Sequence, residues 1–272
     1  QRIKSNATAK PGDVLILGKP IGVGILSAAL KKEVLGSDGY SEMIANTTKL
    51  NTAGPDLAKI TGVHALTDVT GFGLAGHLLE LARASRCTAH IDWSQVPLLS
   101  NVQQLAEDGV ITGASGRNWD SYGNEVAIPS DFTAAQQAIL TDPQTSGGLL
   151  VSCSADCVQE VLDIFHQHHF LGLDAFELTV LHAPEDVLRA VAADAEVGGL
   201  ERRPGLLPDG LALALPGVGV TLLVQLALAI EVTTLAAEAI RKAEGVVEEE
   251  LIIVHHPQHR RRVGHGHVAG GL

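Results

Sequence analysis

The residues with the clearest chemical potential lie in the string LTDVTGFGLAGHLLE, residues 66–80. Asp68 ends an apolar run, and Gly71 and Gly73 follow it directly before a run with helical spacing. Glycines let a backbone approach a ligand closely, a helix N-terminus presents unpaired N–H groups, and a carboxylate can hold the Mg²⁺ that accompanies nucleotide phosphates. The pattern therefore indicates a metal ligand at Asp68 and phosphate contacts at Thr70, Gly71 and Gly73.

The same spacing also fits a purely structural role. Thr67, Asp68 and Thr70 could cap the helix that follows, while the two glycines form a tight turn. Residue types and spacing leave both interpretations open.

A second string, LTDPQTSGGLLVS at residues 140–152, combines an Asp-Pro turn with two glycines. Asp142 and Pro143 form the turn, and Thr145 and Ser146 precede the glycines that lead into an apolar run. By itself this pattern is also typical of an ordinary loop.

Four other side chains carry weaker signals. Lys19 in GKPIG could face a phosphate, but a lone lysine at a strand end is more often a solvated surface charge. His77 lies inside the expected helix, where packing outweighs catalysis because the pattern offers no paired carboxylate. Cys153 and Cys157 are expected to be small packing residues. The sequence therefore identifies no catalytic residue.

The elements that must position these residues follow from hydrophobic periodicity. Strands are expected within residues 13–22, 62–69, 88–93 and 147–153, and helices within 23–34, 41–51, 73–85, 101–109, 133–140 and 154–169. Strands and helices alternate irregularly, which argues against a doubly wound topology. We therefore expect an α+β fold in which a mixed sheet is covered by helices.

Composition limits the partners and the compartment. The net charge of -12 and the pI near 5.4 argue against nucleic acid, because phosphate contacts need clustered Lys and Arg. Three cysteines and no signal-like opening segment predict a reduced, cytoplasmic setting. The chain opens at Gln1 without Met, so we expect sequence upstream of it.

Residues 171–272 differ in composition from the rest of the chain. They contain no Ser, Asn, Tyr, Trp, Met or Cys, and one Lys against seven Arg. We predict a domain over 1–170, or to 180, followed by an extension of unclear origin, with a frameshift or gene fusion as a hypothesis. Residues 211–230 carry no charge, but Pro216, internal glycines and acidic flanks argue against a membrane span.

Histidines gather in two strings, HQHH at 166–169 and HHPQHRRRVGHGH at 255–267. Such clusters could bind a soft divalent metal, although a solvated terminus fits their composition better.

Five strings in consistent order carry a family resemblance: RIKSNATAKPGD, GKPIGVGIL, LTDVTGFG, GRNWDSYG and DPQTSGG. Residues 1 to about 170 resemble the C-terminal domain of the selenophosphate synthetase (selenide, water dikinase) family. That family belongs to the aminoimidazole ribonucleotide synthetase-like superfamily. The resemblance implies an α+β domain, followed here by an unassigned Ala/Leu/Val-rich extension.

The resemblance further implies a reaction in which ATP, selenide and water give selenophosphate, AMP and phosphate. Aspartates hold Mg²⁺ on the nucleotide phosphates, and Asp68 matches one of them. The family's Cys or selenocysteine, its Lys and its dimerisation half would lie upstream of Gln1, so no residue here matches them and a homodimer is expected only with that half. Two alternatives remain: an inert nucleotide-binding or scaffold remnant, and another ATP-using superfamily member, which DPQTSGG disfavours.

Overall fold

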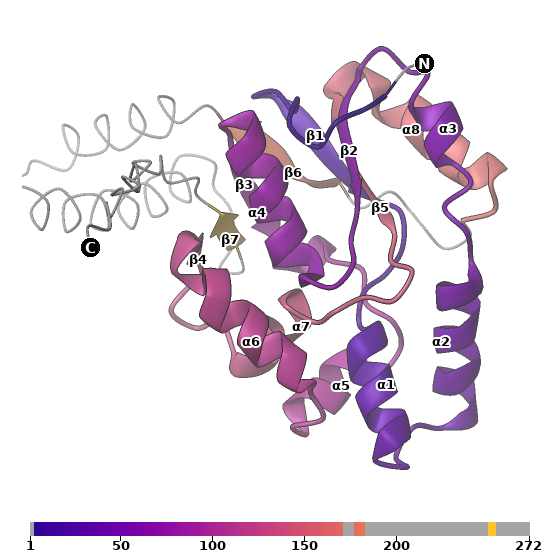
Figure 1. Ribbon diagram of the computed structural model, residues 1–272, viewed down its shortest axis with the longest axis vertical. Helices are drawn as coiled ribbons and strands as arrows, with labels where there is room; N and C mark the ends of the chain where they lie inside the picture. The colour runs from indigo at the N-terminus through magenta and orange to yellow at the C-terminus, as the bar shows by residue number, and fades with distance from the viewer. Residues whose placement is uncertain (1–2, 171–176, 183–249, 254–272) are drawn as a thin grey trace, which may run out of the picture.

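The computed structural model describes residues 3–170, 177–182 and 250–253 (Figure 1). The elements follow in the order β1 (Asp13–Leu17), α1 (Val23–Lys31), α2 (Ser37–Thr48), α3 (Gly54–Leu57), β2 (Val63–Asp68), α4 (Gly73–Ser85), β3 (Thr88–Asp92), α5 (Val102–Glu107), α6 (Gly113–Tyr122), β4 (Val126–Ala127), α7 (Ala134–Leu140), β5 (Leu149–Ser154), α8 (Val158–Gln167), β6 (Glu177–His182) and β7 (Glu250–Ile253). Short 3₁₀ turns cover 93–95, 123–125 and 155–157.

The strands form one sheet in the order β2-β5-β1-β6-β3-β7-β4, with β2 at one edge. The α+β class is confirmed. The expectation of a mixed sheet needs correction, because every strand ladder within the described residues is antiparallel. A parallel contact occurs only as the isolated bridge between Ile21 and Leu98 in this part of the chain. Periodicity identifies strands but carries no information on the direction of their neighbours.

Helices cover both faces of the sheet, as the alternation in β1 requires (Figure 1). Leu15 and Leu17 belong to a cluster with residues of α1, α4 and α7. Val14 and Ile16 belong to a second cluster with residues of α3 and α8. The sheet is therefore the middle of three layers, and α4 lies on one face while α8 lies on the other.

Two strands come from beyond residue 170. β6 lies between β1 and β3, with Val14 opposite Val180 and Ala89 opposite Leu181. β7 lies between β3 and β4. The domain boundary expected at 170, or 180, stays a prediction, and these pairings define how to test it.

The uncharged segment 211–230 and the histidine string 255–267 lie outside the described residues. Within the residues that are described, no helix is long and apolar enough to cross a membrane.

Candidate functional site

The glycine-containing motifs meet at one end of the sheet. β1 and β2 both pair antiparallel with β5, with Leu17 opposite Leu150 and Asp68 opposite Leu149. The last residues of β1 and β2 therefore lie beside the first residues of β5. A Cβ on Gly147 would collide with the carbonyl oxygen of Val69, so backbone approaches backbone closely where the motifs meet.

Backbone hydrogen bonds fix the turn between β2 and α4. The carbonyl of Thr70 accepts from the N–H of Gly73 at 3.1 Å and from the N–H of Gln144 at 2.9 Å. Gly73 has φ +71, and a Cβ there would lie 2.7 Å from the carbonyl carbon of Thr141. Gly73 is therefore needed both for the left-handed conformation and for the close approach.

Two side chains of α6 hold the next carbonyls of the turn. Asn118 Nδ2 donates to the carbonyl of Gly71 at 2.9 Å, and Tyr122 Oη donates to the carbonyl of Phe72 at 2.5 Å. Both come from the GRNWDSYG string, which carries the family resemblance but to which the sequence analysis assigned no site residue.

These bonds determine where the turn's amides point. In a trans peptide the carbonyl and the following N–H point in opposite directions, and no described peptide is cis. Because the carbonyls of Thr70 and Gly71 face their partners, the N–H groups of Gly71 and Phe72 face away from them. Neither N–H donates to a described residue, and both residues are exposed. Backbone N–H groups without an internal acceptor can donate to an anion.

Asp68 lies at the end of β2, two residues before the turn begins. Its side chain is exposed and has no hydrogen bond within the described residues. The described residues contain no group of three His, Cys, Asp or Glu that could hold a metal ion. Asp68 therefore fits Mg²⁺ only in the way nucleotide-bound Mg²⁺ is commonly held, by one or two carboxylates together with phosphate oxygens and water.

The capping interpretation of this motif is wrong. Phe72 is the N-cap residue of α4, and no side chain caps the helix. Thr67 Oγ1 donates to the carbonyl of Asp68 at 3.3 Å, and Thr70 Oγ1 lies 3.1 Å from His77 Nε2.

His77 has a carboxylate partner that the sequence analysis missed. The residue is buried, and its Nδ1 lies 3.2 Å from Glu80 Oε2. That separation meets the distance of an ion pair but not the alignment of a hydrogen bond. Spacing of i and i+3 on a helix places two residues side by side, so the signal was present in the sequence.

Lys19 is neither solvated nor directed at a ligand. Its side chain is 2% exposed, and Nζ donates to the carbonyls of Asn46, Lys49 and Ser146 at 3.2, 2.5 and 2.6 Å. The first two carbonyls belong to the C-terminal end of α2, where a cation is favourable. Burial, with the nearby charge of Lys49, lowers the pKa of Lys19 to about 8.

The DPQ part of the second motif caps α1. Gln144 Oε1 accepts from the N–H groups of residues 22 and 23 at 3.0 and 3.2 Å, and Asp142 Oδ2 accepts from those of residues 24 and 25 at 2.8 and 3.2 Å. The four N–H groups that a helix leaves unpaired at its start are thereby satisfied. Burial raises the pKa of Asp142 to about 7, although these hydrogen bonds oppose the shift.

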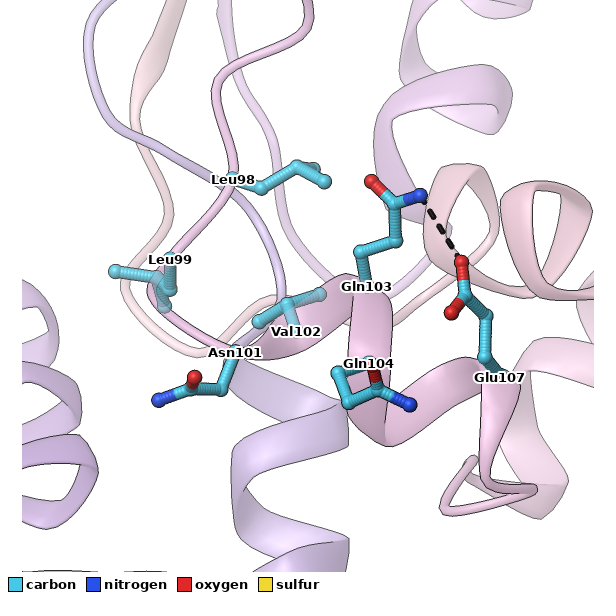
Figure 2. Close-up of a pocket in the computed structure, with 7 residues that line it drawn as sticks. All are labelled: Leu98, Leu99, Asn101, Val102, Gln103, Gln104 and Glu107. Atoms are coloured by element: carbon cyan, nitrogen blue, oxygen red, sulfur yellow. Dashed lines mark hydrogen bonds between the residues drawn. The ribbon is translucent and has the colours of Figure 1, made fainter.

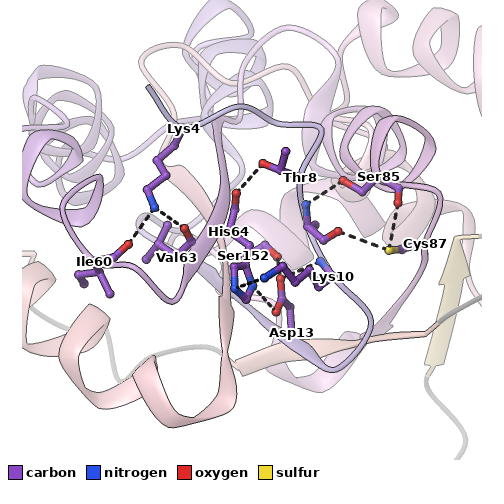
Figure 3. A network of polar contacts seen from close by, with 11 residues as sticks. Lys4, Thr8, Lys10, Asp13, Ile60, Val63, His64, Ser85, Cys87 and Ser152 are labelled. Carbon is purple, nitrogen blue, oxygen red and sulfur yellow. Dashed lines mark hydrogen bonds and ion pairs between the residues drawn. The ribbon is translucent and has the colours of Figure 1, made fainter. Parts of the chain in front are cut away.

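A separate polar network lies at the opposite end of the sheet, where β1 and β2 begin (Figure 3). Asp13 Oδ1 lies 2.7 Å from His64 Nδ1, and Ser152 Oγ donates to Asp13 Oδ2 at 2.6 Å. Lys10 Nζ lies 3.0 Å from His64 Nε2. Together these contacts hold the segment before β1 against the sheet.

An open pocket beside α5 contains none of the predicted site residues (Figure 2). Its lining consists of Leu98, Leu99, Asn101, Val102, Gln103, Gln104 and Glu107. Gln103 donates to Glu107 at 3.0 Å, so the pocket's carboxylate already has a partner. The chemistry of the chain is better sought at the turn between β2 and α4.

The remaining candidates pack or pair within the fold. Cys153 is buried in the cluster against α8, and Cys157 packs against the same cluster, which confirms their packing role. In the HQHH string, His168 contacts Asp56 at 2.9 Å and Thr52 at 3.0 Å.

Comparison with known proteins identifies a family whose model matches more than half of the chain. The family described as AIR synthase related protein, C-terminal domain, matches residues 10–176. The selenide, water dikinase of Pseudomonas straminea is 62% identical over 170 residues, covering 62% of this chain and 48% of that protein. The selenide, water dikinase of Paraburkholderia xenovorans is 59% identical over 170 residues, with the same coverage. The chain spans about half the length of the curated relatives it matches.

Solved structures with a related arrangement are more distant. The crystal structure of Escherichia coli HypE matches with a TM-score of 0.47 and 22% identity, covering 66% of this chain and 47% of that one. Thiamine-monophosphate kinase from Stenotrophomonas maltophilia matches with a TM-score of 0.46 and 16% identity, covering 66% and 51%.

Proposed function

We propose, from the premise that the chain belongs to the AIR synthase related protein family through its C-terminal domain, that it supplies phosphate-binding residues to a selenide, water dikinase. The reaction is the conversion of selenide, ATP and water to selenophosphate, AMP and phosphate. The proposal rests on the names of the relatives and on one structural observation. That observation is the pair of backbone N–H groups at Gly71 and Phe72, which have no described acceptor and follow the exposed carboxylate of Asp68 in the same turn.

Each residue of the turn has a distinct role in this proposal. The N–H groups of Gly71 and Phe72 bind a phosphate oxygen of ATP, because backbone amides without an internal acceptor can satisfy an anion without a cation. Asp68 would hold the Mg²⁺ that accompanies the nucleotide, and the ion would neutralise part of the phosphates' charge. Gly73 shapes the turn, since its own N–H is bonded to the carbonyl of Thr70.

The nucleophile of the reaction is not among the residues assigned here. The resemblance attributes it to a Cys or selenocysteine, which is accompanied by a Lys in the other half of the family fold. We therefore expect the 272 residues by themselves to bind nucleotide without turning over selenide. Selenide-dependent release of AMP by the purified chain would contradict this expectation.

The proposed partners and compartment follow from the family resemblance and from the composition of the chain. ATP and selenide are the proposed substrates, and the homodimer of the family is expected only where the dimerisation half accompanies this one. The acidic charge argues against nucleic acid, and three cysteines with no disulfide fit a cytoplasmic location.

Calorimetric titration of ATP into the chain, with and without Mg²⁺, tests the proposal. We expect binding that depends on Mg²⁺. We expect Asp68→Asn to weaken this binding about tenfold or more, since removing a residue that supports a bound metal commonly lowers metal affinity by at least that factor. Asp131→Asn is the matched control, because Asp131 is an exposed loop carboxylate without a described partner. Equal affinity of the Asp68 variant and the wild type across Mg²⁺ concentrations would remove Asp68 from the metal site.

A further inference from the structure

A lysine, a histidine and an aspartate are linked in series where β1 and β2 begin (Figure 3). Lys10 Nζ lies 3.0 Å from His64 Nε2, and His64 Nδ1 lies 2.7 Å from Asp13 Oδ1. Lys10 is exposed, His64 is half-buried and Asp13 is buried. The series therefore runs from an amine that faces solvent inward to a buried carboxylate.

A tight turn holds the backbone of the lysine beside the aspartate. The carbonyl of Lys10 accepts from the N–H of Asp13 at 3.1 Å, and the N–H of Lys10 donates to Asp13 Oδ2 at 2.9 Å. Pro11 and Gly12 stand between them, and Gly12 has φ +85. Proline followed by a glycine with positive φ is typical of a type II turn. The Lys10 side chain therefore starts from a fixed point next to the network.

The carboxylate of Asp13 decides which ring nitrogen of the histidine carries the proton. Asp13 Oδ2 accepts from Ser152 Oγ at 2.6 Å as well as from the backbone of Lys10, and Oδ1 faces His64 Nδ1. An ionised carboxylate has no proton to donate, so the ring nitrogen that faces it must be the donor. His64 therefore carries its proton on Nδ1 and turns the lone pair of Nε2 toward the amine of Lys10.

We propose that Lys10 is a site of acylation by acyl phosphates, with His64 as the base for its amine. A nucleophile within hydrogen-bond reach of a base, which a third group orients, is the arrangement that activates weak nucleophiles. One proton of the Lys10 ammonium passes to His64 Nε2, which leaves a nitrogen lone pair to attack the acyl carbon. The carbon–oxygen bond to phosphate breaks, the phosphate takes its electron pair and the second proton of the nitrogen, and His64 releases the first proton to water.

Two features of the network suit this reaction. When His64 takes up the proton, its Nδ1–H already faces Asp13, so the carboxylate stabilises the imidazolium that forms. Phosphate leaves as a stable anion, so an acyl phosphate requires from the protein an amine and a base but no general acid. The ammonium groups of Lys4 and Lys19 instead donate to backbone carbonyls, which do not take up a proton. The site is independent of the proposed phosphate turn, which lies at the other end of the sheet.

Mass spectrometry of the full chain treated with acetyl phosphate near neutral pH tests the proposal. We expect Lys10 to be acetylated at least about tenfold faster than Lys31, an exposed lysine in the last turn of α1, because general-base assistance typically contributes about 100-fold or more. His64→Gln should bring the rate at Lys10 to within about threefold of that at Lys31. His166→Gln, the same change on the exposed surface of α8, should leave the rate at Lys10 unchanged.

Equal rates at Lys10 and Lys31 in the wild type would overturn the proposal, and so would a Lys10 that stays fast in a folded His64→Gln variant. Thermal unfolding checks that this variant is folded. Nitrogen-15 NMR of the histidine rings in the wild type needs no variant, and we expect it to show His64 protonated on Nδ1 and unprotonated on Nε2. A proton on Nε2 would leave Lys10 without a base and would overturn the proposal by itself.

Discussion

Charged side chains of the glycine-rich motifs divide according to burial. Lys19 and Asp142 are buried, and each is held by backbone groups of a helix end. Asp68 is exposed and has no hydrogen bond within the described residues. A buried charge costs several kcal/mol unless it is hydrogen-bonded, so Lys19 and Asp142 are tied to the fold. Asp68 is the member of this set that is free to bind a ligand.

Asp142 makes a residue-scale prediction about pH. Its folded pKa of about 7 lies above the ordinary 3.8, so the folded state holds the proton more tightly than the unfolded state. Its contribution to stability is therefore fully present below about pH 4 and lost as pH rises through about 7. We expect Asp142→Asn to gain stability relative to the wild type over this window, by up to about 1.4 kcal/mol per pH unit.

Urea unfolding of the wild type and of Asp142→Asn between pH 4.5 and 7.5 measures this difference. Asp131→Asn, which changes an exposed carboxylate, should show no such trend. A stability difference between Asp142→Asn and the wild type that stays constant with pH would mean that the helix N–H groups keep Asp142 ionised throughout.

Helix ends and turns are where elements of this fold meet. The loop after α7 caps α1 through Gln144 and Asp142, and α6 holds the turn before α4 through Asn118 and Tyr122. Both sets satisfy backbone groups that would otherwise be left unpaired near the interior. The direction of the amides at the proposed phosphate site therefore depends on a helix that contributes no ligand itself.

An element-scale prediction concerns this support. Removing the hydrogen bonds to the turn with Asn118→Ala or Tyr122→Phe should let the carbonyls of Gly71 and Phe72 rotate. We expect the affinity for Mg²⁺ and ATP to fall about fivefold, equivalent to roughly 1 kcal/mol per lost hydrogen bond. Calorimetry measures the affinity, and hydrogen exchange at Gly73, whose N–H donates to the carbonyl of Thr70, should become faster.

Gln103→Ala provides the control for this support, because Gln103 donates to Glu107 on the exposed surface of α5 rather than to the turn. If both α6 variants show faster hydrogen exchange at the turn but unchanged affinity for Mg²⁺ and ATP, the conformation of the turn does not control nucleotide binding, and this prediction is wrong.

At the scale of the whole molecule, the sheet is completed by strands from both sides of residue 170. β6 is the shared neighbour of β1 and β3, so the ladder that joins the two halves of the sheet passes through it. His182 is the last residue of β6 and pairs with Thr88. A chain that ends at Phe170 lacks this strand, and one that ends at Val180 lacks its pairing with β3.

Truncation tests the domain boundary. We expect a chain ending at His182 to keep a cooperative thermal transition close to that of the full protein, and a chain ending at Phe170 to melt at a lower temperature because β1 and β3 lose their common neighbour. A chain ending at Val180 should fall between them. Loss of cooperativity in all three, while the full chain unfolds sharply, would extend the domain to include β7.

Local patterns in the sequence determine the class of this fold and the location of its proposed site. The continuous apolar run in residues 13–17 and the helical period in 73–85 each arise within one element, so they predict β1 and α4 without any knowledge of neighbours. The glycines of TDVTGFG likewise indicate a turn where backbone approaches backbone, and the ordered motifs carry the family resemblance.

The tertiary structure alone decides which polar groups are used up and which remain available. Lys19 reaches Ser146, 127 positions along the chain, and Asn118 reaches Gly71, 47 positions back. Strand direction and the central place of β6 are also set by partners distant in sequence. The physical reason is that periodicity reports how a residue repeats within its own element, whereas the fate of a buried charge, a carbonyl or an amide depends on what another element brings to it.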